Sequence, residues 1–244
     1  MLEGISTGMF SEDKPSYEDA LVQHANYVKV IENLGVDTLV LDPLEEYPDS
    51  SFVEDPAVVL KECAIITNSP RESRYGEKFE IEPAIKKFYP DDKIYYIKAP
   101  GTMKGGDAML VGKHIYIGLS DRINEEGASQ FDKIVSKYGY TTSTIPVTEG
   151  LHLKDFAIYL ENNNMLVSEK MNKEKEFQKF NRFVVSKDEL YAINSLYING
   201  KVLVPEGFPK TLSYIKALGY PVEVINTDEF KKIDGSLTCL SLRF

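Results

Sequence analysis

The chain has 244 residues and a formal net charge of −10 at pH 7, from 28 Lys and Arg against 38 Asp and Glu. This excess of acid argues against a protein that binds nucleic acid through a basic surface, and no stretch approaches the roughly 20 apolar residues of a membrane helix. Two cysteines and three histidines are too few for a disulfide framework or a thiolate-rich metal site. We therefore expect a cytoplasmic protein with no metal, no membrane contact and no nucleic acid partner.

The first predicted element is a helix over residues 17–34. Gly35 is expected to end it, and residues 37–41 are predicted to form a strand. One apolar face is indicated by helical spacing of Ala20, Leu21, His24, Tyr27, Val28 and Ile31.

A pattern of strand, polar segment, helix and strand then recurs four times. The leading strands are predicted near residues 64, 115, 165 and 202, the helices up to 89 and over 125–139, 173–180 and 210–218, and the closing strands over 93–97, 141–147, 182–185 and 221–225. A period of about 40 to 50 residues suggests repeated supersecondary units, and the amino-terminal helix and strand resemble the rear of a fifth. No linker divides the sequence, so we expect a single domain over 1–244. The loops of such units would meet around a pocket.

Three carboxylates stand close together around an apolar segment that we interpret as a strand. They are Asp49, Glu54 and Asp55. Carboxylates can bind a planar cation with several N–H donors in bidentate fashion. A solvated turn is the alternative interpretation.

Paired glycines precede an acid at Gly105, Gly106 and Asp107. The segment lacks the spacings of the phosphate-binding loops GxxxxGK[ST] and GxGxxG, so nucleotide binding is rejected.

A cysteine and a histidine are the candidates for covalent chemistry. An Asp-Gly turn at 234–235 precedes a predicted strand over 237–244, and Cys239 would lie near its beginning. His152 follows a glycine and stands between two leucines. A packed, inert cysteine and a hydrogen-bonded structural histidine are the alternatives. A nucleophile and its base need to be neighbours only in space.

Taken in order, these segments resemble the dimethylarginine dimethylaminohydrolase family of the guanidino-modifying superfamily, which has the pentein fold, and particularly its short bacterial form. The resemblance is carried by Pro48-Asp49-Ser50 with Phe52-Val53-Glu54-Asp55, residues 73–77, Gly105-Gly106-Asp107, residues 117–120 with Arg122 and Asn124, residues 151–154 and residues 233–244. It implies a five-bladed α/β propeller. A strand that begins the family's first blade is missing from this sequence, so that blade is expected to be incomplete.

The resemblance also implies a chemistry and a set of roles. The family's cysteine hydrolases convert N-omega-methylated arginines into citrulline and methylamine or dimethylamine through a covalent thiouronium intermediate, without a cofactor. Cys239 matches the nucleophile and His152 the acid/base. The implied substrate-binding residues are Asp55 with Glu54 for the guanidinium, Asp49 at another binding position, Arg74 and Arg122 for the α-carboxylate, and the backbone carbonyls of Ile5 and Ile233 for the α-amino group. The expected partner is a small cationic guanidino substrate, and family likeness suggests a homodimer.

One position departs from the family pattern. Lys104 stands where the family has an acid that orients the histidine, and a cation there disfavours protonation of His152. Asp107 or another acid would have to compensate. Two alternatives therefore stay open: an arginine deiminase-type activity on arginine, and a catalytically weak guanidinium-binding homologue.

Overall fold

The computed structural model describes residues 1–148, 150 and 152–244, and the chain forms two compact units. One unit comprises Met1–Asp42 and Lys154–Thr238, and the other comprises Pro43–Leu153 and Cys239–Phe244. The chain crosses between them after residues 42, 153 and 238. The predicted single domain over 1–244 stays a prediction.

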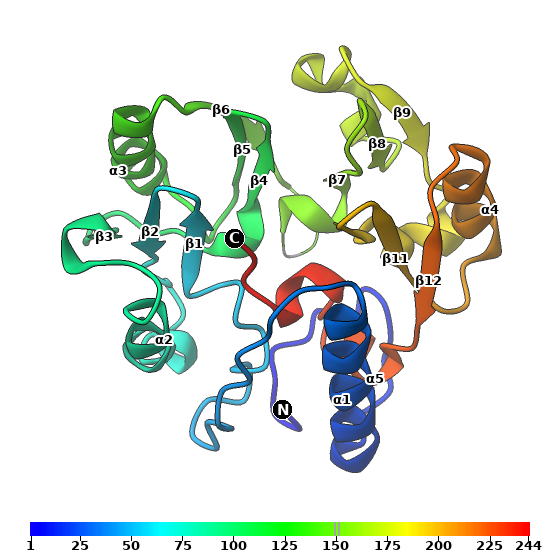
Figure 1. Ribbon diagram of the computed structural model, residues 1–244, viewed down its shortest axis with the longest axis horizontal. Coiled ribbons are helices and arrows are strands. Elements are labelled where there is room, and N and C mark those ends of the chain that lie inside the picture. The colour runs from blue at the N-terminus through cyan, green and yellow to red at the C-terminus, as the bar shows by residue number, and fades with distance from the viewer. Residues whose placement is uncertain (149, 151) are drawn as a thin grey trace. The chain divides into compact units, whose positions relative to one another are not determined.

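The unit built mainly from residues 43–153 contains two three-stranded sheets, shown in Figure 1. Their strands are β1 (Ala57–Leu60), β2 (Cys63–Ile66) and β3 (Ile94–Tyr96) in one sheet, and β4 (Ala108–Val111), β5 (His114–Leu119) and β6 (Thr141–Pro146) in the other. In each sheet the hairpin partner is antiparallel, while the strand reached through a helix is parallel. This is the pattern that short turns and helical crossovers impose.

Two helices make these crossovers, α2 (Glu77–Ile85) and α3 (Glu125–Val135). The side chain of Asn124 caps α3 by accepting a hydrogen bond from the backbone N–H of Gly127 at 2.8 Å. The buried face of α3 joins β2, β5 and Met103 in one apolar core, which includes Ile65, Ile115, Ile117 and Phe131. Met103 of this core directly precedes Lys104 and the turn Gly105–Asp107 that leads into β4.

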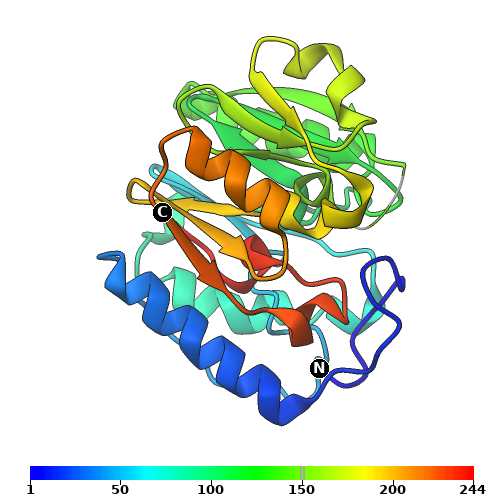
Figure 2. The ribbon, with the colours of Figure 1, turned by 90° about the vertical axis from the view of Figure 1, so that its right-hand side faces the viewer.

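The other unit repeats the same pattern twice. Its elements are α1 (Tyr17–Asn33), β7 (Ala157–Tyr159), β8 (Asn164–Val167), β9 (Asn181–Val184), β10 (Leu196–Ile198), β11 (Lys201–Pro205), α4 (Pro209–Ala217), β12 (Val222–Ile225) and α5 (Asp228–Lys231). The strands form the sheets β7-β8-β9 and β10-β11-β12. Figure 2 shows α4 lying along the second of these sheets.

The four leading strands and most of the helices predicted from sequence are confirmed. The predicted helix over 17–34 is α1, with Gly35 in the left-handed region (φ 81°) immediately after it. The predicted helix over 173–180 is wrong, because two short 3₁₀ turns, Met171–Lys173 and Lys175–Phe177, connect β8 to β9.

Three predicted strands are also wrong. Residues 47–56 form consecutive turns, and residues 37–41 pair with no strand in the described part of the chain, leaving Leu39 and Val40 about half exposed. A strand needs a partner for its backbone groups.

The third wrong strand, over 237–244, is replaced by the 3₁₀ turn Leu237–Leu240 followed by irregular chain. Its backbone is held by other groups: the carbonyl of Leu237 accepts from the Tyr27 hydroxyl at 2.8 Å, and the N–H of Thr238 donates to Asn194 Oδ1 at 3.1 Å.

The described residues contain four three-stranded sheets and no closed barrel. The fold is therefore α/β with mixed sheets. Among these residues, no helix has both the length and the apolar character that crossing a membrane requires.

Candidate active site

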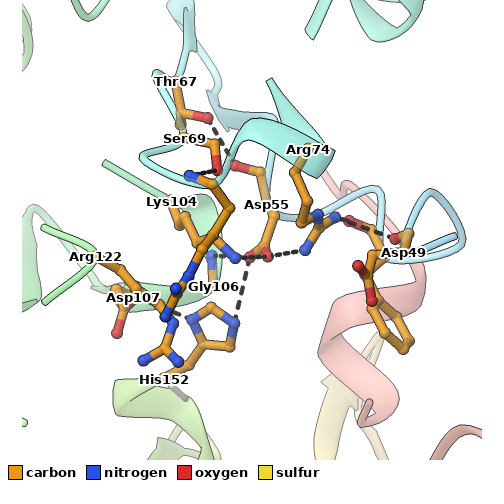
Figure 3. A network of polar contacts seen from close by, with 12 residues as sticks. Asp49, Asp55, Thr67, Ser69, Arg74, Lys104, Gly106, Asp107, Arg122 and His152 are labelled. Atoms are coloured by element: carbon orange, nitrogen blue, oxygen red, sulfur yellow. Dashed lines mark hydrogen bonds and ion pairs between the residues drawn. The ribbon is translucent and has the colours of Figure 1, made fainter. Parts of the chain in front are cut away.

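His152 lies between two buried carboxylates, as Figure 3 shows. Its Nδ1 is 2.9 Å from Oδ2 of Asp107, and its Nε2 is 3.6 Å from Oδ1 of Asp55. The other oxygen of Asp107 accepts the backbone N–H of Leu153 at 2.8 Å. The acid therefore fixes both the imidazole ring and the backbone that follows it. Such a histidine can exchange a proton at Nε2 while Nδ1 stays bonded.

The two carboxylates also control the charge of the imidazole. Burial by itself would lower the pKa of His152, but the negative charges of Asp55 and Asp107 and the hydrogen bond that the imidazole donates to Asp107 outweigh it. The pKa of His152 therefore lies above its ordinary value of 6.5. Lys104 opposes the shift, in the direction expected from sequence. Asp107 supplies the orienting acid that Lys104 does not.

Asp55 is the centre of the polar network in Figure 3. Its Oδ2 accepts from Nη1 of Arg74 and, at 3.0 Å, from Nζ of Lys104. Its Oδ1 accepts from the backbone N–H of Gly106 at 3.3 Å. Burial would raise the pKa of this carboxyl, but Lys104, His152 and Arg74 together hold that pKa well below its ordinary value of 3.8. Asp55 is thus an ionised, buried acid.

The guanidinium of Arg74 is surrounded by protein acceptors. Its Nε and Nη2 pair with the carboxylate of Glu77 at 2.7–3.0 Å, and Nη2 also donates to the backbone carbonyls of Asp49 and Phe52 at 3.1 Å. Arg74 therefore holds the turns of residues 49–52 against Asp55. Its predicted contact with a substrate carboxylate stays a prediction.

The loop that ends in Asp107 packs closely against the imidazole. A Cβ added at Gly106 would lie 2.8 Å from Oδ1 of Asp55 and 3.0 Å from the ring of His152. Only glycine leaves room for the ring at this distance. The Gly-Gly-Asp sequence thus combines a close backbone approach with the acid that orients the histidine.

Cys239 belongs to the same compact unit as His152. It is 6% exposed, and its backbone carbonyl accepts from the N–H of Glu54 at 3.2 Å. Glu54 precedes Asp55, whose carboxylate faces His152. The carboxylate of Glu54 is paired with Nη2 of Arg243 at 3.0 Å. The chain segments of the candidate nucleophile, base and guanidinium-binding acids therefore come together in one unit.

The remaining predicted residues of this unit are also buried. Asp49 is 2% exposed and Arg122 is 7% exposed. Nη1 of Arg122 contacts Oδ1 of Asp121 at 3.0 Å and the carbonyl of Gly150 at 3.4 Å. Arg74 and Arg122 thus pair with different acids here.

Ile5 and Ile233 belong to the other unit and are described separately. Ile233 is buried just after α5, and Ile5 is partly buried. The two segments are joined by Asp234, whose Oδ2 accepts from the backbone N–H of Thr7 at 2.5 Å and from its hydroxyl at 2.7 Å. The two segments predicted to bind one α-amino group therefore contact each other.

Comparison with known proteins shows the family to which the chain belongs. A family model described as "N,N dimethylarginine dimethylhydrolase, eukaryotic" matches residues 7–172. The chain is 45% identical over 231 residues to the N(G),N(G)-dimethylarginine dimethylaminohydrolase of Pseudomonas aeruginosa, covering 95% of this chain and 91% of that protein. It is 31% identical over 243 residues to the enzyme of the same name from Streptomyces coelicolor, covering 100% and 92%. The chain belongs to the dimethylarginine dimethylaminohydrolase family.

Solved structures show the same relationship. A cysteine-to-serine mutant of the Pseudomonas aeruginosa dimethylarginine dimethylaminohydrolase, complexed with citrulline, superposes with a TM-score of 0.96 at 42% identity, covering 100% of this chain and 94% of that chain. The N-terminal domain of a cyanobacterial arginine dihydrolase has a TM-score of 0.84 at 16% identity, covering 99% and 94%, which shows a shared fold alone. The fold is thus that of the dimethylarginine dimethylaminohydrolases within the pentein superfamily.

Sequence reasoning missed several residues of this family member's site. Glu77 and Arg243 had been given no role, although they hold Arg74 and Glu54 in place. Asp107 was predicted only as one of the acids that could compensate for Lys104, and the structure shows that it bonds His152. The segment over 151–154 includes Leu151, which lies outside the described residues. The described residues contain no cluster of three or more His, Cys, Asp or Glu side chains suited to a metal ion.

Proposed function

We propose that this protein hydrolyses the substituted guanidinium of N-omega-methylated arginines, giving citrulline and methylamine or dimethylamine. The observation that carries the proposal is the position of His152 between Asp107 and Asp55, within the unit that contains Cys239. Membership of the dimethylarginine dimethylaminohydrolase family supports the same reaction. It requires no cofactor.

The binding step places the planar guanidinium cation against buried carboxylates. Asp55, with Glu54 and Asp49, would hold it, because a carboxylate and a guanidinium match in charge and in bidentate geometry. Arg122 and Arg74 would receive the α-carboxylate. The backbone carbonyls of Ile5 and Ile233 would accept hydrogen bonds from the α-amino group.

The first chemical step forms a bond from sulfur to carbon. A cation brought beside Cys239 favours its thiolate, and Sγ attacks the central guanidinium carbon. Protonated His152 gives its proton to the substituted nitrogen, the C–N bond breaks, and methylamine or dimethylamine leaves. The raised pKa of His152 suits this role, since it keeps the acid form populated at neutral pH.

The second step returns the enzyme to its starting state. Neutral His152 takes a proton from water, and the oxygen attacks the carbon of the thiouronium intermediate. The C–S bond breaks, which regenerates the thiolate, and the ureido product citrulline loses its extra proton to solvent.

The test is incubation with N-omega,N-omega-dimethylarginine, followed by measurement of citrulline and dimethylamine. Cys239→Ser should remove product formation while leaving the thermal unfolding midpoint nearly unchanged. Cys63→Ala is the control. Cys63 is buried in β2, and burial raises the pKa of its thiol to about 11, so it should not act as a nucleophile. Undiminished turnover by Cys239→Ser would refute the nucleophile assignment.

One observation favours a second candidate, the catalytically weak guanidinium-binding homologue. Lys104 and Arg74 both neutralise the acid proposed to receive the substrate. Binding of dimethylarginine without any citrulline formation would identify this case. Arginine deiminase activity would instead appear as ammonia release from arginine, faster than amine release from methylated arginines.

The proposal also covers the fold, the domain organisation, the location and the oligomeric state of the protein. Four sheets with one topology, together with α1, support a five-bladed propeller. We also propose a single functional domain over 1–244, a cytoplasmic location and a homodimer, following family likeness.

A further inference from the structure

Lys104 forms an ion pair with Asp55, the acid that we propose as the guanidinium-binding group. Its side chain is 5% exposed, and its ammonium lies 3.0 Å from Oδ2 of Asp55. Among the described residues, Asp55 is its one ion-pair partner. A buried lysine with one carboxylate partner places a cation where the substrate cation would have to arrive.

The carboxylate of Asp55 has too few open positions to bind a guanidinium as it stands. Oδ2 accepts from Arg74 and Lys104, and Oδ1 accepts from the N–H of Gly106 and faces His152. A carboxylate has about four lone-pair positions, and a bidentate guanidinium uses both oxygens. One of the two cations must therefore move before a guanidinium can pair with both oxygens of Asp55.

Arg74 is held much more firmly than Lys104. The guanidinium of Arg74 also bonds the carboxylate of Glu77 and two backbone carbonyls, whereas Lys104 pairs with a single carboxylate among the residues that the structure describes. Arginine presents a rigid planar fork, while lysine carries a compact charge on a flexible four-carbon stem. The two cations approach Asp55 from opposite sides in Figure 3. Lys104 is consequently the one that can leave without breaking the rest of the network.

A small pocket lies beside the ion pair of Lys104 and Asp55. Its lining includes Lys104 and Asp55 together with the oxygen-bearing side chains of Thr67, Ser69 and Glu77. Hydroxyl and carboxylate oxygens can accept hydrogen bonds from an ammonium group. Because Arg74 and Lys78 line the same pocket and Glu77 is paired with Arg74, the hydroxyl oxygens of Thr67 and Ser69 are the acceptors proposed for the displaced ammonium.

We propose that Lys104 is an internal competitor of the substrate, which binds Asp55 in the ligand-free protein and is displaced when a guanidinium arrives. This inference rests on the proposed role of Asp55 in substrate binding. Its consequence is a weakened affinity for guanidinium ligands, because only molecules with Lys104 displaced can bind. If that open state is about a tenth of the population, the apparent dissociation constant is about tenfold above the intrinsic one.

The experiment measures binding in a Cys239→Ser background, where turnover does not interfere. Isothermal titration calorimetry would be carried out with N-omega,N-omega-dimethylarginine and with methylguanidine, which has no amino-acid end. Lys104→Met keeps an unbranched side chain of similar length and removes the charge. It should lower the dissociation constant of both ligands by about tenfold. Lys104→Gln is a second neutral variant, in case the methionine variant does not fold.

Two controls isolate the position of the charge. Lys104→Arg keeps a cation beside Asp55 and should not tighten binding. Lys78→Met removes a lysine from the same small pocket, where its ammonium contacts Asn68 and the ring of Tyr75 rather than Asp55. It should leave the dissociation constants within about twofold of the parent, because the charge of Lys78 is not paired with Asp55.

The outcomes separate this inference from the proposed function. Equal or weaker binding by both neutral variants would overturn the role of Lys104, while citrulline formation by the protein with Cys239 intact would leave the function standing. Absence of guanidinium binding in every variant would overturn both, since Asp55 would then not be a substrate site.

Discussion

At the scale of single residues, the protonation of His152 is decided by its two acid neighbours. Burial disfavours the imidazolium, and Lys104 adds to that effect, yet Asp55 and Asp107 together raise its pKa. A buried histidine between two cations would be neutral. Between two carboxylates the imidazolium is favoured, which suits the role of proton donor proposed for His152.

The substitution Asp107→Asn tests how much the charge of Asp107 raises the pKa of His152. Asparagine keeps an oxygen for the N–H of Leu153 but removes the charge that faces Nδ1 of His152. The pKa of His152 should therefore fall, so the alkaline limb of kcat/KM should move to lower pH. The loss of a correctly oriented acid/base should lower kcat by on the order of 10²–10⁴.

The pH–rate profile, with the NMR titration of His152, provides the measurement. A structural role for Asp107 alone would reduce the amount of folded enzyme but leave the alkaline limb where it is. An unchanged limb together with an unchanged imidazole titration would contradict the prediction.

At the scale of elements, the turn Gly105–Asp107 and strand β5 determine how closely the imidazole can pack. This turn leads into β4, which pairs with β5. Gly118 lies within β5, where an added Cβ would come 2.8 Å from Oδ1 of Asp107. Because neither Gly106 nor Gly118 has a side chain, Asp107 can be fully buried next to His152.

Gly106→Ala should disrupt the site more than the fold. The new methyl group would push against Asp55 and the ring of His152, so we expect about 1–3 kcal/mol of destabilisation and a large loss of kcat. Gly139→Ala is the matched control, because Gly139 has φ 78° in open space. Its left-handed backbone should cost about 1 kcal/mol without changing kcat. Urea unfolding measures the stability of each variant, and steady-state rates measure its kcat. An equal loss of kcat in Gly106→Ala and Gly139→Ala would contradict the prediction.

At the scale of the whole molecule, a buried ion cluster should make stability depend on pH. The pKa of Asp55 lies well below 3.8 in the folded protein, while the unfolded chain binds a proton near that value. A group with a lowered pKa contributes stability that is present above the unfolded value and is lost as pH falls towards the folded value. Acidification below about pH 4 should therefore weaken the fold through Asp55.

Asp55→Asn should remove that part of the acid dependence. At pH 7 the variant should be less stable by about 3–5 kcal/mol, because Arg74 and Lys104 lose the charge between them. Free energies of unfolding in urea, measured from pH 7 down to pH 3, give both quantities. A parent and variant with parallel curves below pH 4 would contradict the role of Asp55.

The repeated pattern of elements was predictable because it depends on local periodicity. The apolar runs at β2, β5, β8 and β11 and the helical spacing in α1 are properties of short segments. The segment 237–244 was misjudged because its backbone bonds to groups far away in the chain, such as the Tyr27 hydroxyl. Residues 37–41 were wrongly predicted to form a strand, because a composition typical of strands does not by itself supply a neighbouring strand to pair with.

By itself, the sequence determined the order of the elements, the family likeness and the candidate nucleophile and acid/base, because these depend on residue identity and spacing. Only the tertiary structure decided that Asp107 takes over the orientation of His152 and that Lys104 is paired with Asp55. Both depend on contacts between residues 45 and 49 positions apart in the chain. Electrostatic interactions fall off with distance in space and have no periodicity along the sequence, so folding was needed to show which charges meet.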